Sequence, residues 1–474
     1  MGMANEAEST QLAIIGGGPG GYAAAFLAAD LGLEVTLIDG EPNPGGVCLY
    51  RGCIPSKALL HVAKVISESK EAGAWGIHFS EPEIELDKLR SWKEQVVRKL
   101  TGGLGQLSRQ RKINYIQGQA GFKDARTLEI KKQEGKAQLR FQNAILATGS
   151  YPASLPHLSP DSPRLLDSTS ALEIQDIPKT LLVIGAGYIG LEMATVYASL
   201  GSQVTVVEMT EGLLPGADRD LASVLGKRLE GVLHSLLFKT KVTHMEEEAK
   251  GIRVHLEGAE EGKHLFEKVL VAVGRKPNSA IPGLERTQVE LNDKGFIQVN
   301  AQRQTTDSAI FAIGDVVGEP MLAHKASHEG RIAAEVVAGR RVFFEPRTIP
   351  AVVFTDPEVA WCGLTETEAK AEGQAIQVAR FPWAASGRAV TLDRTDGLTK
   401  LIIDPETERI LGAGIVGPGA GELIAELVLA VEMAAVASDI KLSIHPHPTL
   451  SETVMEAAEV FFGQSTHLYR PAKK

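Results

Sequence analysis

Two stretches of the chain share one order of apolar and polar positions. In residues 12–39, LAIIGGGPGGYAAAFLAADLGLEVTLID, a short apolar run meets a glycine-rich turn, an alanine-rich segment follows, and a second apolar run ends in an acid. Residues 181–208, LLVIGAGYIGLEMATVYASLGSQVTVVE, repeat this order. A short apolar run bounded by glycines predicts a strand, and the alanine-rich segment predicts a helix. The chain therefore contains two strand–turn–helix–strand units.

The remaining segments divide the chain further. Mixed helix and strand signals lie between the two units, and β signals follow the second unit as far as residues 269–275. A third block, residues 277–341, contains IFAIGD, and the last part combines strand patterns with a helix-like stretch at 421–437. Prolines 152, 277 and 346 lie near the expected boundaries. The expected domains are residues 1–151, 152–276, 277–345 and 346–474.

Composition narrows the possible partners. The 474 residues are 44% hydrophobic and 23% charged, which is ordinary for a folded protein. With 49 basic and 59 acidic side chains the net charge is −10, so the surface repels phosphate backbones and nucleic-acid binding is not expected. Such a surface favours a basic protein partner.

The expected compartment is the cytoplasm. The longest apolar runs have about 11 residues, whereas a membrane-spanning helix needs about 20. The first residues, MGMANEAESTQ, show no basic region followed by an apolar core, so no secretory signal is expected. Three cysteines cannot form a disulfide scaffold in a chain of this length, and a disulfide in a reducing compartment is more often catalytic.

The glycine turns of the two units have the pattern of dinucleotide-binding sites. In each unit the last glycine of the turn, Gly21 or Gly190, precedes the terminal acid, Asp39 or Glu208, by 18 residues. Such glycines let the backbone approach a pyrophosphate at a helix N-terminus, and the acid accepts hydrogen bonds from a ribose diol. Glu208 would repel a 2′-phosphate, and no arginine follows it directly, so NAD rather than NADP is expected.

A third GxGxxG match lacks this context. Residues 412–417 fit the glycine spacing, but they lead into Pro418 without a helix or an acid-terminated strand. We interpret them as a structural turn. Two nucleotide sites in one chain suggest electron transfer from one cofactor to another, most simply between a flavin and a nicotinamide.

Cys48 and Cys53, in GGVCLYRGCIPSK, are the candidate redox pair. Pro55 suits the first turn of a helix, so Cys53 is expected at a helix N-terminus, where the dipole favours the thiolate. Lys57, four residues later, falls on the same helical face and would place a positive charge near it. A pair of buried, inert thiols is the alternative, and Cys362 has no cysteine neighbour and receives no role.

A second candidate element is SIHPHPTLSE, residues 443–452. His445 and His447 alternate with prolines that restrict the backbone. A histidine is the usual general base near neutral pH, and Glu452 would orient it and stabilise its cation. A structural or metal-binding role for the two histidines remains open at this point.

GGVCLYRGCIPSKALL, GYIGLE, IFAIGD and HPHPTLSE occur in this order, and together they resemble the dihydrolipoamide dehydrogenase family of flavoprotein disulfide reductases. The likeness covers essentially the whole chain. It implies an α/β fold with two Rossmann-like domains for FAD and NAD, a central domain that completes the FAD site, and a C-terminal α+β dimerisation domain. It also implies one non-covalent FAD per subunit.

The resemblance assigns roles to individual residues. Cys48, Cys53, His447 and Glu452 would be catalytic, and Lys57 would pair with Glu192 beside the flavin. The FAD residues would be Gly16, Gly18, Gly21, Asp39, Gly46, Lys57, Ala120, Gly149, Asp315 and Ala323. The residues on the NAD side would be Gly185, Gly187, Gly190, Glu192, Glu208, Val242, Ala272, Gly274 and Arg275. A helix starting near Leu322 would point its N-terminus at the flavin.

The family's reaction would make the chain an oxidoreductase. His447, contributed by the other subunit of a homodimer, would deprotonate a dihydrolipoyl thiol, which attacks Cys48 of the redox-active disulfide and leaves Cys53 facing the flavin. Electrons would then reach NAD. The implied partners are dihydrolipoyl groups on the E2 component or the glycine-cleavage H protein, and the E2 subunit-binding domain.

Four positions depart from the family pattern. Tyr50 and Arg51 replace Asn and Val between the cysteines, and Arg51 adds positive charge there. Tyr188 resembles the gating tyrosine of glutathione reductase, and Asp39 is shorter than the usual Glu.

Other functions fit less well. Glutathione reductase would have an arginine after Glu208 and tends to have Lys in place of Ser56. Mercuric reductase would need a C-terminal cysteine pair, which HLYRPAKK lacks, and a soluble transhydrogenase would lack the paired cysteines. A subunit used chiefly for assembly of a multienzyme complex is the alternative from a different class.

Overall fold

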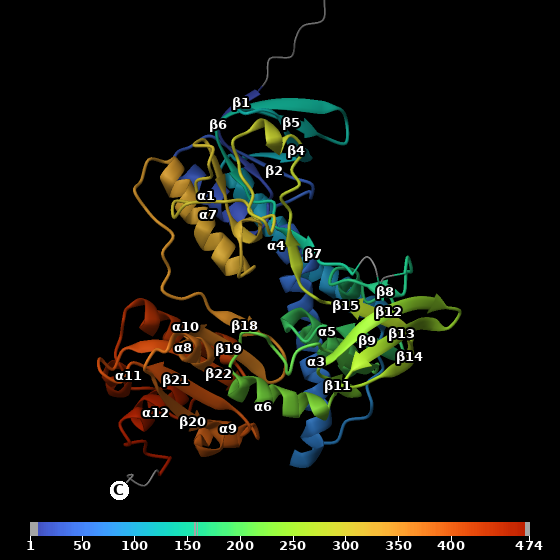
Figure 1. Cartoon of the computed structure of the whole chain (residues 1–474), viewed down its shortest axis with the longest axis vertical. Coiled ribbons are helices and arrows are strands. Elements are labelled where there is room, and N and C mark those ends of the chain that lie inside the picture. Colours follow the sequence, from blue (N-terminus) through green and yellow to red (C-terminus); the bar gives the residue numbers. More distant parts are fainter. Residues whose placement is uncertain (1–7, 156–157, 159, 470–474) are drawn as a thin grey trace, which may run out of the picture.

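The computed structural model describes residues 8–155, 158 and 160–469. The first seven residues, where a signal was not expected, and the residues after Tyr469 lie outside this description. Figure 1 shows the first unit and residues 310–337 at one end of the molecule and the second unit beside the C-terminal part at the other, with α3, Cys53–Glu71, running between the two ends. No helix in the described ranges is long and apolar enough to cross a bilayer.

The first unit forms the core of a seven-stranded sheet. Its order is β3-β2-β1-β6-β5-β4, and β17 pairs with β6. Strand β1 runs parallel to β2 and β6, which places Ile14 beside Leu37 and Ile145. Both faces of β1 are buried, as its continuous apolar run requires. The strands are β1 Glu8–Ile15, β2 Val35–Asp39, β3 Asn114–Gln117, β4 Gln119–Asp124, β5 Thr127–Lys131, β6 Lys136–Leu146 and β17 Ile310–Ala312.

Five helices among the described residues accompany this sheet. Helix α1, Pro19–Asp30, and helix α7, Ala323–Val337, pack side by side in Figure 1. The expected helix after Leu322 is therefore confirmed. Helices α2, Gly46–Arg51, and α3, Cys53–Glu71, carry the two cysteines, and α4, Leu86–Gln110, follows the 3₁₀ turn Ala72–Trp75. Cys53 is the first residue of α3, as Pro55 predicts.

The second unit forms a five-stranded parallel sheet, β11-β10-β9-β15-β8, joined to the antiparallel sheet β12-β13-β14. A short pair, β16 with β7, connects residues 275–277 to residues 150–152. The strands are β7 Ser150–Pro152, β8 Leu165–Leu166, β9 Thr180–Ile184, β10 Gln203–Val207, β11 Ser235–Leu237, β12 Thr240–Glu248, β13 Gly251–Gly258, β14 Gly262–Phe266, β15 Lys268–Val271 and β16 Arg275–Pro277. The helices are α5 Tyr188–Ser199 and α6 Arg219–Glu230, and 3₁₀ turns lie at Ser170–Glu173, Leu284–Arg286 and Gly314–Val317.

The C-terminal part is an antiparallel sheet, β18-β19-β22-β21-β20, covered by helices. The strands are β18 Ala351–Val353, β19 Glu358–Gly363, β20 Gln377–Pro382, β21 Leu398–Ile403 and β22 Ile410–Gly417. The helices are α8 Glu366–Glu372, α9 Gly387–Thr391, α10 Ala420–Glu432, α11 Ala437–Leu442 and α12 Glu452–Phe461, with a 3₁₀ turn at Trp383–Ala385.

Two local predictions for this part were wrong. The glycines of residues 412–417 lie in the central strand β22 and not in a turn. Glycine is needed there for close packing: a Cβ on Gly412 would come within 2.0 Å of the Leu364 carbonyl oxygen, and one on Gly417 within 2.3 Å of Trp383. The helix expected over 421–437 ends at Glu432, because Ala434 has a left-handed φ of 55° and its N–H bonds back to the Val431 carbonyl.

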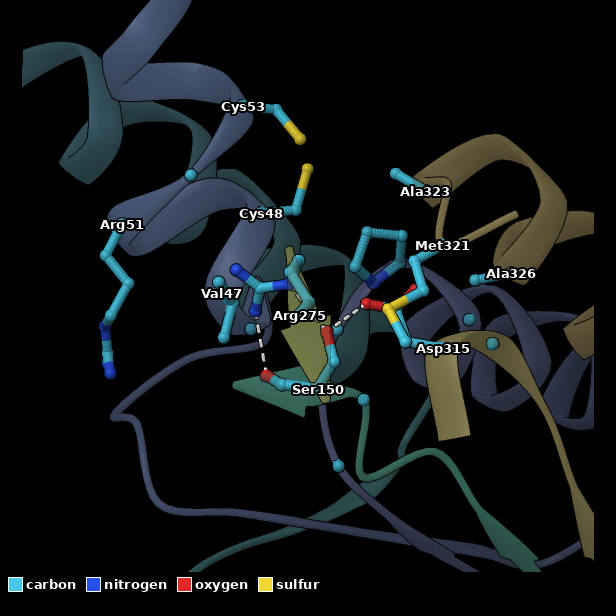
Figure 2. Close-up of a pocket in the computed structure, with 18 of the residues that line it drawn as sticks. Val47, Cys48, Arg51, Cys53, Ser150, Arg275, Asp315, Met321, Ala323 and Ala326 are labelled. Atoms are coloured by element: carbon cyan, nitrogen blue, oxygen red, sulfur yellow. Dashed lines mark hydrogen bonds between the residues drawn. The ribbon is translucent and has the colours of Figure 1, made fainter. Parts of the chain in front are cut away.

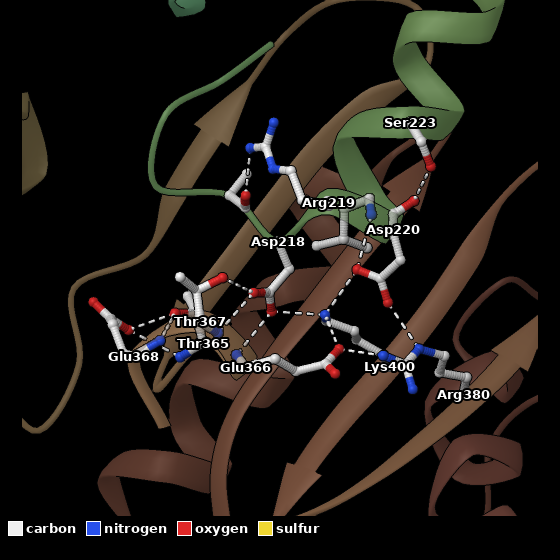
Figure 3. A network of polar contacts seen from close by, with 12 residues as sticks. Asp218, Arg219, Asp220, Ser223, Thr365, Glu366, Thr367, Glu368, Arg380 and Lys400 are labelled. Atoms are coloured by element: carbon white, nitrogen blue, oxygen red, sulfur yellow. Dashed lines mark hydrogen bonds and ion pairs between the residues drawn. The ribbon is translucent and has the colours of Figure 1, made fainter. Parts of the chain in front are cut away.

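A buried lysine joins the second unit to the C-terminal sheet (Figure 3). Lys400, which is 1% exposed, lies 2.6 Å from Asp218, 2.8 Å from Asp220 and 2.6 Å from Glu366. Arg380 pairs with Asp220 and Glu366 as well. The three carboxylates converge as metal ligands would, but the Lys400 ammonium occupies the space between them, so the cluster is a structural contact between the two parts.

Candidate active site

A cavity of about 660 Å³ lies where the first unit, the cysteine helices and the second unit meet (Figure 2). Cys48 and Cys53 face each other on one side, and Asp315, Met321 and Ala323 line the other. The predicted site residues on its wall are Gly16, Gly18, Asp39, Gly46, Cys48, Cys53, Lys57, Gly149, Glu192, Arg275, Asp315 and Ala323. Ala120 lines an adjoining cavity of about 580 Å³ that shares Gly16 and Asp39.

The first glycine turn leaves open backbone donors at the start of α1. The helix begins after Gly18, and no side chain caps it, so its first N–H groups are available to an anion. A Cβ on Gly21 would lie 1.8 Å from the Gly16 carbonyl oxygen, which explains the need for glycine there. Asp39 accepts the Gly17 N–H at 2.5 Å and the Glu41 N–H at 2.8 Å. This arrangement fits a dinucleotide.

The two cysteines are free thiols with opposite pKa shifts. A hydrogen bond from the Cys48 thiol lowers the pKa of Cys53 to about 7 against the opposing effect of burial, and the charge of Lys57 adds to this lowering. The same hydrogen bond, together with burial, raises the pKa of Cys48. The two shifts favour the thiolate at Cys53 and the protonated thiol at Cys48. The sequence predicted this thiolate from the helix N-terminus and from Lys57. The structure supports the effect of Lys57 and adds the hydrogen bond from the Cys48 thiol.

These shifts predict how Cys53 reacts with pH. With the pair reduced, iodoacetamide should alkylate Cys53 with an inflection near pH 7 and not near the ordinary value of 9, because only the thiolate reacts. Peptide mass spectrometry after timed labelling from pH 5 to 9 measures this. The Cys48→Ala variant, which lacks the donating thiol, should move the inflection upward. Buried Cys362 should stay unlabelled, and an inflection near 9 in the unaltered protein would contradict the assignment.

Lys57 lies beside the cysteines and pairs with Glu192 of the second unit. The Lys57 Nζ is 2.8 Å from Glu192 Oε2, and Glu192 is almost fully buried. Glu192 also accepts the Phe354 N–H at 3.1 Å, and the Phe354 ring lies 4.6 Å from the ammonium. The predicted pair is confirmed. The structure places Glu192 on the wall of the large cavity, and sequence reasoning missed Phe354.

Asp315 belongs to a chain of hydrogen bonds that joins three segments. Ser150 donates to Asp315 at 2.5 Å, and Arg275 donates to the Ser150 hydroxyl at 2.7 Å and to its carbonyl at 2.8 Å. Arg275, predicted on the nicotinamide side, therefore also lines the large cavity. Buried Glu329 accepts the Gly314 N–H at 2.6 Å and holds the turn that presents Asp315. Sequence reasoning missed Ser150 and Glu329, since only the fold brings them to Asp315.

The second glycine turn repeats the geometry of the first. Helix α5 starts after Gly187 without a side-chain cap, and a Cβ on Gly190 would lie 2.1 Å from the Gly185 carbonyl oxygen. Glu208 accepts the Ala186 N–H at 2.9 Å and the Thr210 N–H at 2.8 Å. The other predicted residues of this side lie on or directly after neighbouring strands: Val242 on β12, and Ala272 and Gly274 after β15. Tyr188, the first residue of α5, lines the large cavity.

His447 and Glu452 form the predicted pair in the C-terminal part. His447 Nδ1 lies 2.8 Å from Glu452, which also accepts the Thr449 N–H. Burial raises the pKa of Glu452, but these two hydrogen bonds outweigh it, so the pKa lies below its ordinary value. His445 pairs instead with Glu426 at 2.8 Å. In the described chain neither histidine belongs to a group of three possible metal ligands.

The pair does not line the cysteine cavity of its own chain. None of the cavity-lining residues follows Ala326, and the His447 side chain is 74% exposed. The imidazole is thus free to face a second subunit.

Together these features define the class of enzyme to which the protein belongs. The site contains a dithiol with one stabilised thiolate, and it lies beside one dinucleotide-binding turn and within reach of a second. This is the arrangement of a nucleotide-dependent disulfide oxidoreductase.

Comparison with known proteins gives the family. Residues 10–330 match the pyridine nucleotide-disulphide oxidoreductase family, and residues 349–458 match its dimerisation domain. The chain is 51% identical over 460 residues to dihydrolipoyl dehydrogenase of Vibrio cholerae, covering 97% of both chains, and 51% identical over 461 residues to that of Haemophilus influenzae, covering 97% and 96%. The chain belongs to the dihydrolipoyl dehydrogenase family, whose cofactors are FAD and NAD.

Solved structures agree with this fold. LpdA from Mycobacterium tuberculosis superposes with a TM-score of 0.88 at 26% identity, covering 95% of this chain and 99% of that one. A Cu(II) complex of the flavoprotein disulfide reductase RclA from Escherichia coli superposes with a TM-score of 0.86 at 28% identity, covering 96% of this chain and 99% of that one. The expected α/β fold is confirmed, and the dimerisation domain supports the expected homodimer.

Proposed function

We propose that this chain oxidises dihydrolipoyl groups to lipoyl groups and reduces NAD⁺ to NADH. The observation that carries the proposal is the Cys48–Cys53 pair on the wall of a dinucleotide cavity, with the thiolate assigned to Cys53. The relatives at 51% identity are named for this activity. Steady-state assays of dihydrolipoamide and of reduced glutathione, each with NAD⁺ and with NADP⁺, test it. Turnover confined to glutathione and NADP⁺ would contradict it.

FAD would be held along the large cavity. The open N–H groups at the start of α1 would take its diphosphate, Asp39 a ribose, and Asp315 the ribityl chain. The remaining residues of the site would be Gly16, Gly18, Gly21, Gly46, Lys57, Ala120, Gly149 and Ala323. The glycine contacts and the cavity fit this cofactor. When bound, FAD transfers the electron pair of the dithiol to NAD⁺.

NAD⁺ would be held at the second turn, with Glu208 on the adenosine ribose. The other residues proposed for this site are Gly185, Gly187, Gly190, Glu192, Val242, Ala272, Gly274 and Arg275. The four proposed domains are the expected ones: 1–151 for FAD, 152–276 for NAD, 277–345 to complete the FAD site and 346–474 for dimerisation.

The protein's own residues account for the thiol chemistry. With the pair oxidised, a substrate thiolate attacks the Cys48 sulfur, which breaks the Cys48–Cys53 bond and leaves Cys53 as the thiolate. The second substrate sulfur then attacks the first, which forms the lipoyl disulfide and releases Cys48 as a thiolate that takes up a proton. Lys57 stabilises the Cys53 anion, and Glu192 keeps that ammonium beside it. This division of roles follows the opposite pKa shifts of the two thiols.

The base in this scheme comes from a second subunit. The partner subunit's His447 would remove the proton from the attacking substrate thiol, and Glu452 of the partner subunit would hold that imidazole and stabilise its cation. Exposure of His447 and its absence from the cavity of its own chain support this placement.

The lipoyl group would arrive on a carrier protein. We propose the E2 component of a 2-oxo acid dehydrogenase complex or the glycine-cleavage H protein as carrier, and a basic E2 subunit-binding domain as a docking partner, because the chain has a net charge of −10. Binding that added salt does not weaken would contradict the electrostatic docking. The small number of cysteines supports a cytoplasmic location.

The choice of nicotinamide can be tested at Glu208. Replacing it by Arg should raise the KM for NAD⁺ about tenfold, equivalent to ~1.4 kcal/mol, and lower the KM for NADP⁺, because the ribose acceptor is replaced by a partner for the 2′-phosphate. Glu230→Arg is the matched control, since this exposed carboxylate ends α6 and should leave both values unchanged. An unaltered preference in Glu208→Arg would mean that the ribose lies elsewhere.

A further inference from the structure

Arg51 is a charged residue of the large cavity that the thiol chemistry does not use. It is the last residue of α2, two positions before Cys53, yet its side chain points away from both sulfurs (Figure 2). Its guanidinium pairs with Glu41, with the two side chains 41% and 27% exposed. The largest causes of the shifted pKa values of the two thiols are their mutual hydrogen bond, burial and the charge of Lys57. Its charge is directed to another part of the cavity.

That part is the end of the cavity at Asp39. Arg51 and Glu41 line the same cavity as Asp39, and the Glu41 N–H donates to the Asp39 carboxylate at 2.8 Å. Burial raises the pKa of Asp39, while the Gly17 N–H and the charge of Arg51 oppose this effect. Arg51 thus connects the helix that carries the cysteines to the loop after β2 through Glu41.

The charges around the cavity show what Arg51 supplies. Its lining includes four acids, Asp39, Glu41, Glu192 and Asp315, and three bases, Arg51, Lys57 and Arg275. Lys57 bonds to Glu192, and Arg275 bonds to Ser150. At the Asp39 end two carboxylates would repel an anionic diphosphate unless Arg51 offset them. A guanidinium has five N–H donors. Those on one edge of the Arg51 group bind Glu41, and the remaining donors are available to a phosphate or a ribose oxygen.

We propose that Arg51 is a binding residue for the adenosine diphosphate part of FAD, held in place by Glu41 so that it closes the cavity beside Asp39. A valine at this position, as in the family pattern, has no group for such a contact. The proposal deepens the FAD assignment made above and rests on it. It makes Arg51 a residue for cofactor retention, distinct from the thiol relay.

The affinity of the holoenzyme for FAD tests this role. Serial dilution of Arg51→Val and Arg51→Gln holoenzyme, followed by the fluorescence of released FAD, should give dissociation constants about tenfold above the unaltered protein. The dissociation constant of Arg51→Lys should lie between that of the unaltered protein and that of Arg51→Val, because lysine keeps the charge and loses the paired donors of the guanidinium. The difference should shrink in 1 M KCl, since the pair is partly exposed. Arg340→Val is the matched control: its pair with Glu335, 54% and 23% exposed, lies outside the cavity.

Two measurements distinguish a role of Arg51 in FAD binding from a role in the thiol chemistry. The pH profile of Cys53 alkylation should be the same in Arg51→Val as in the unaltered protein. An FAD affinity in Arg51→Val and Arg51→Gln equal to that of the unaltered protein would overturn the proposal. A shifted Cys53 profile with unchanged affinity would assign Arg51 to the thiols instead. A purified unaltered protein that neither contains nor takes up FAD would overturn the cofactor assignment itself.

Discussion

Replacing Cys48 by Ser is expected to abolish the oxidation of dihydrolipoamide, with a loss on the order of 10⁶-fold, as when the nucleophile of a covalent mechanism is removed. The serine oxygen cannot form the mixed disulfide with the substrate, so the first bond exchange has no acceptor. Steady-state formation of NADH from dihydrolipoamide and NAD⁺ measures the effect. Cys53 alone cannot replace Cys48, because one sulfur cannot both bind the substrate and store the electron pair as a disulfide.

The same variant should keep reactions that bypass the dithiol. Oxidation of NADH by an artificial acceptor needs the two nucleotide sites and not Cys48, so Cys48→Ser should stay within about twofold of the unaltered protein in that assay. Cys362→Ser is the matched control, since its thiol is buried in the C-terminal core, and it should keep dihydrolipoamide activity. Dihydrolipoamide turnover within tenfold of normal in Cys48→Ser would refute the relay.

Replacing His447 by Gln should lower kcat with dihydrolipoamide by about 10²- to 10⁴-fold, the usual contribution of a general base. Glutamine can hydrogen-bond but cannot take the substrate thiol proton near neutral pH. NADH oxidation by an artificial acceptor should be nearly unchanged, because no substrate thiol is deprotonated there. His244→Gln is the control, since this exposed histidine lies on β12. Equal loss in both assays for His447→Gln would reject the base assignment.

A mixed dimer tests whether the base acts across subunits. When one subunit carries Cys48→Ser and the other His447→Gln, a site that combines residues from both chains leaves one intact site. The purified heterodimer should then have about half of normal activity, although both parent homodimers are inactive. An inactive heterodimer would mean that Cys48 and His447 act within one chain.

Much of the fold follows from local patterns. Both strand–turn–helix–strand units were predictable because buried parallel strands appear as apolar runs, and because the turn leaves no room for a Cβ at Gly21 or Gly190. The helix start at Cys53 was predictable from Pro55. The same local reasoning failed at residues 412–417 and beyond Glu432, where the contacts of a central strand and a left-handed Ala434 decide the backbone.

By itself, the sequence determined the two nucleotide turns, their terminal acids, the cysteine pair and the His447–Glu452 pair, since each belongs to one motif with a recognisable spacing. Only the tertiary structure decided which distant groups complete the site. Ser150 and Arg275 reach Asp315, Glu329 holds Gly314, and the Arg51 guanidinium faces Glu41 and not the sulfurs. Such contacts join residues of different motifs, whose relative positions depend on how the elements pack and not on the spacing within any one motif.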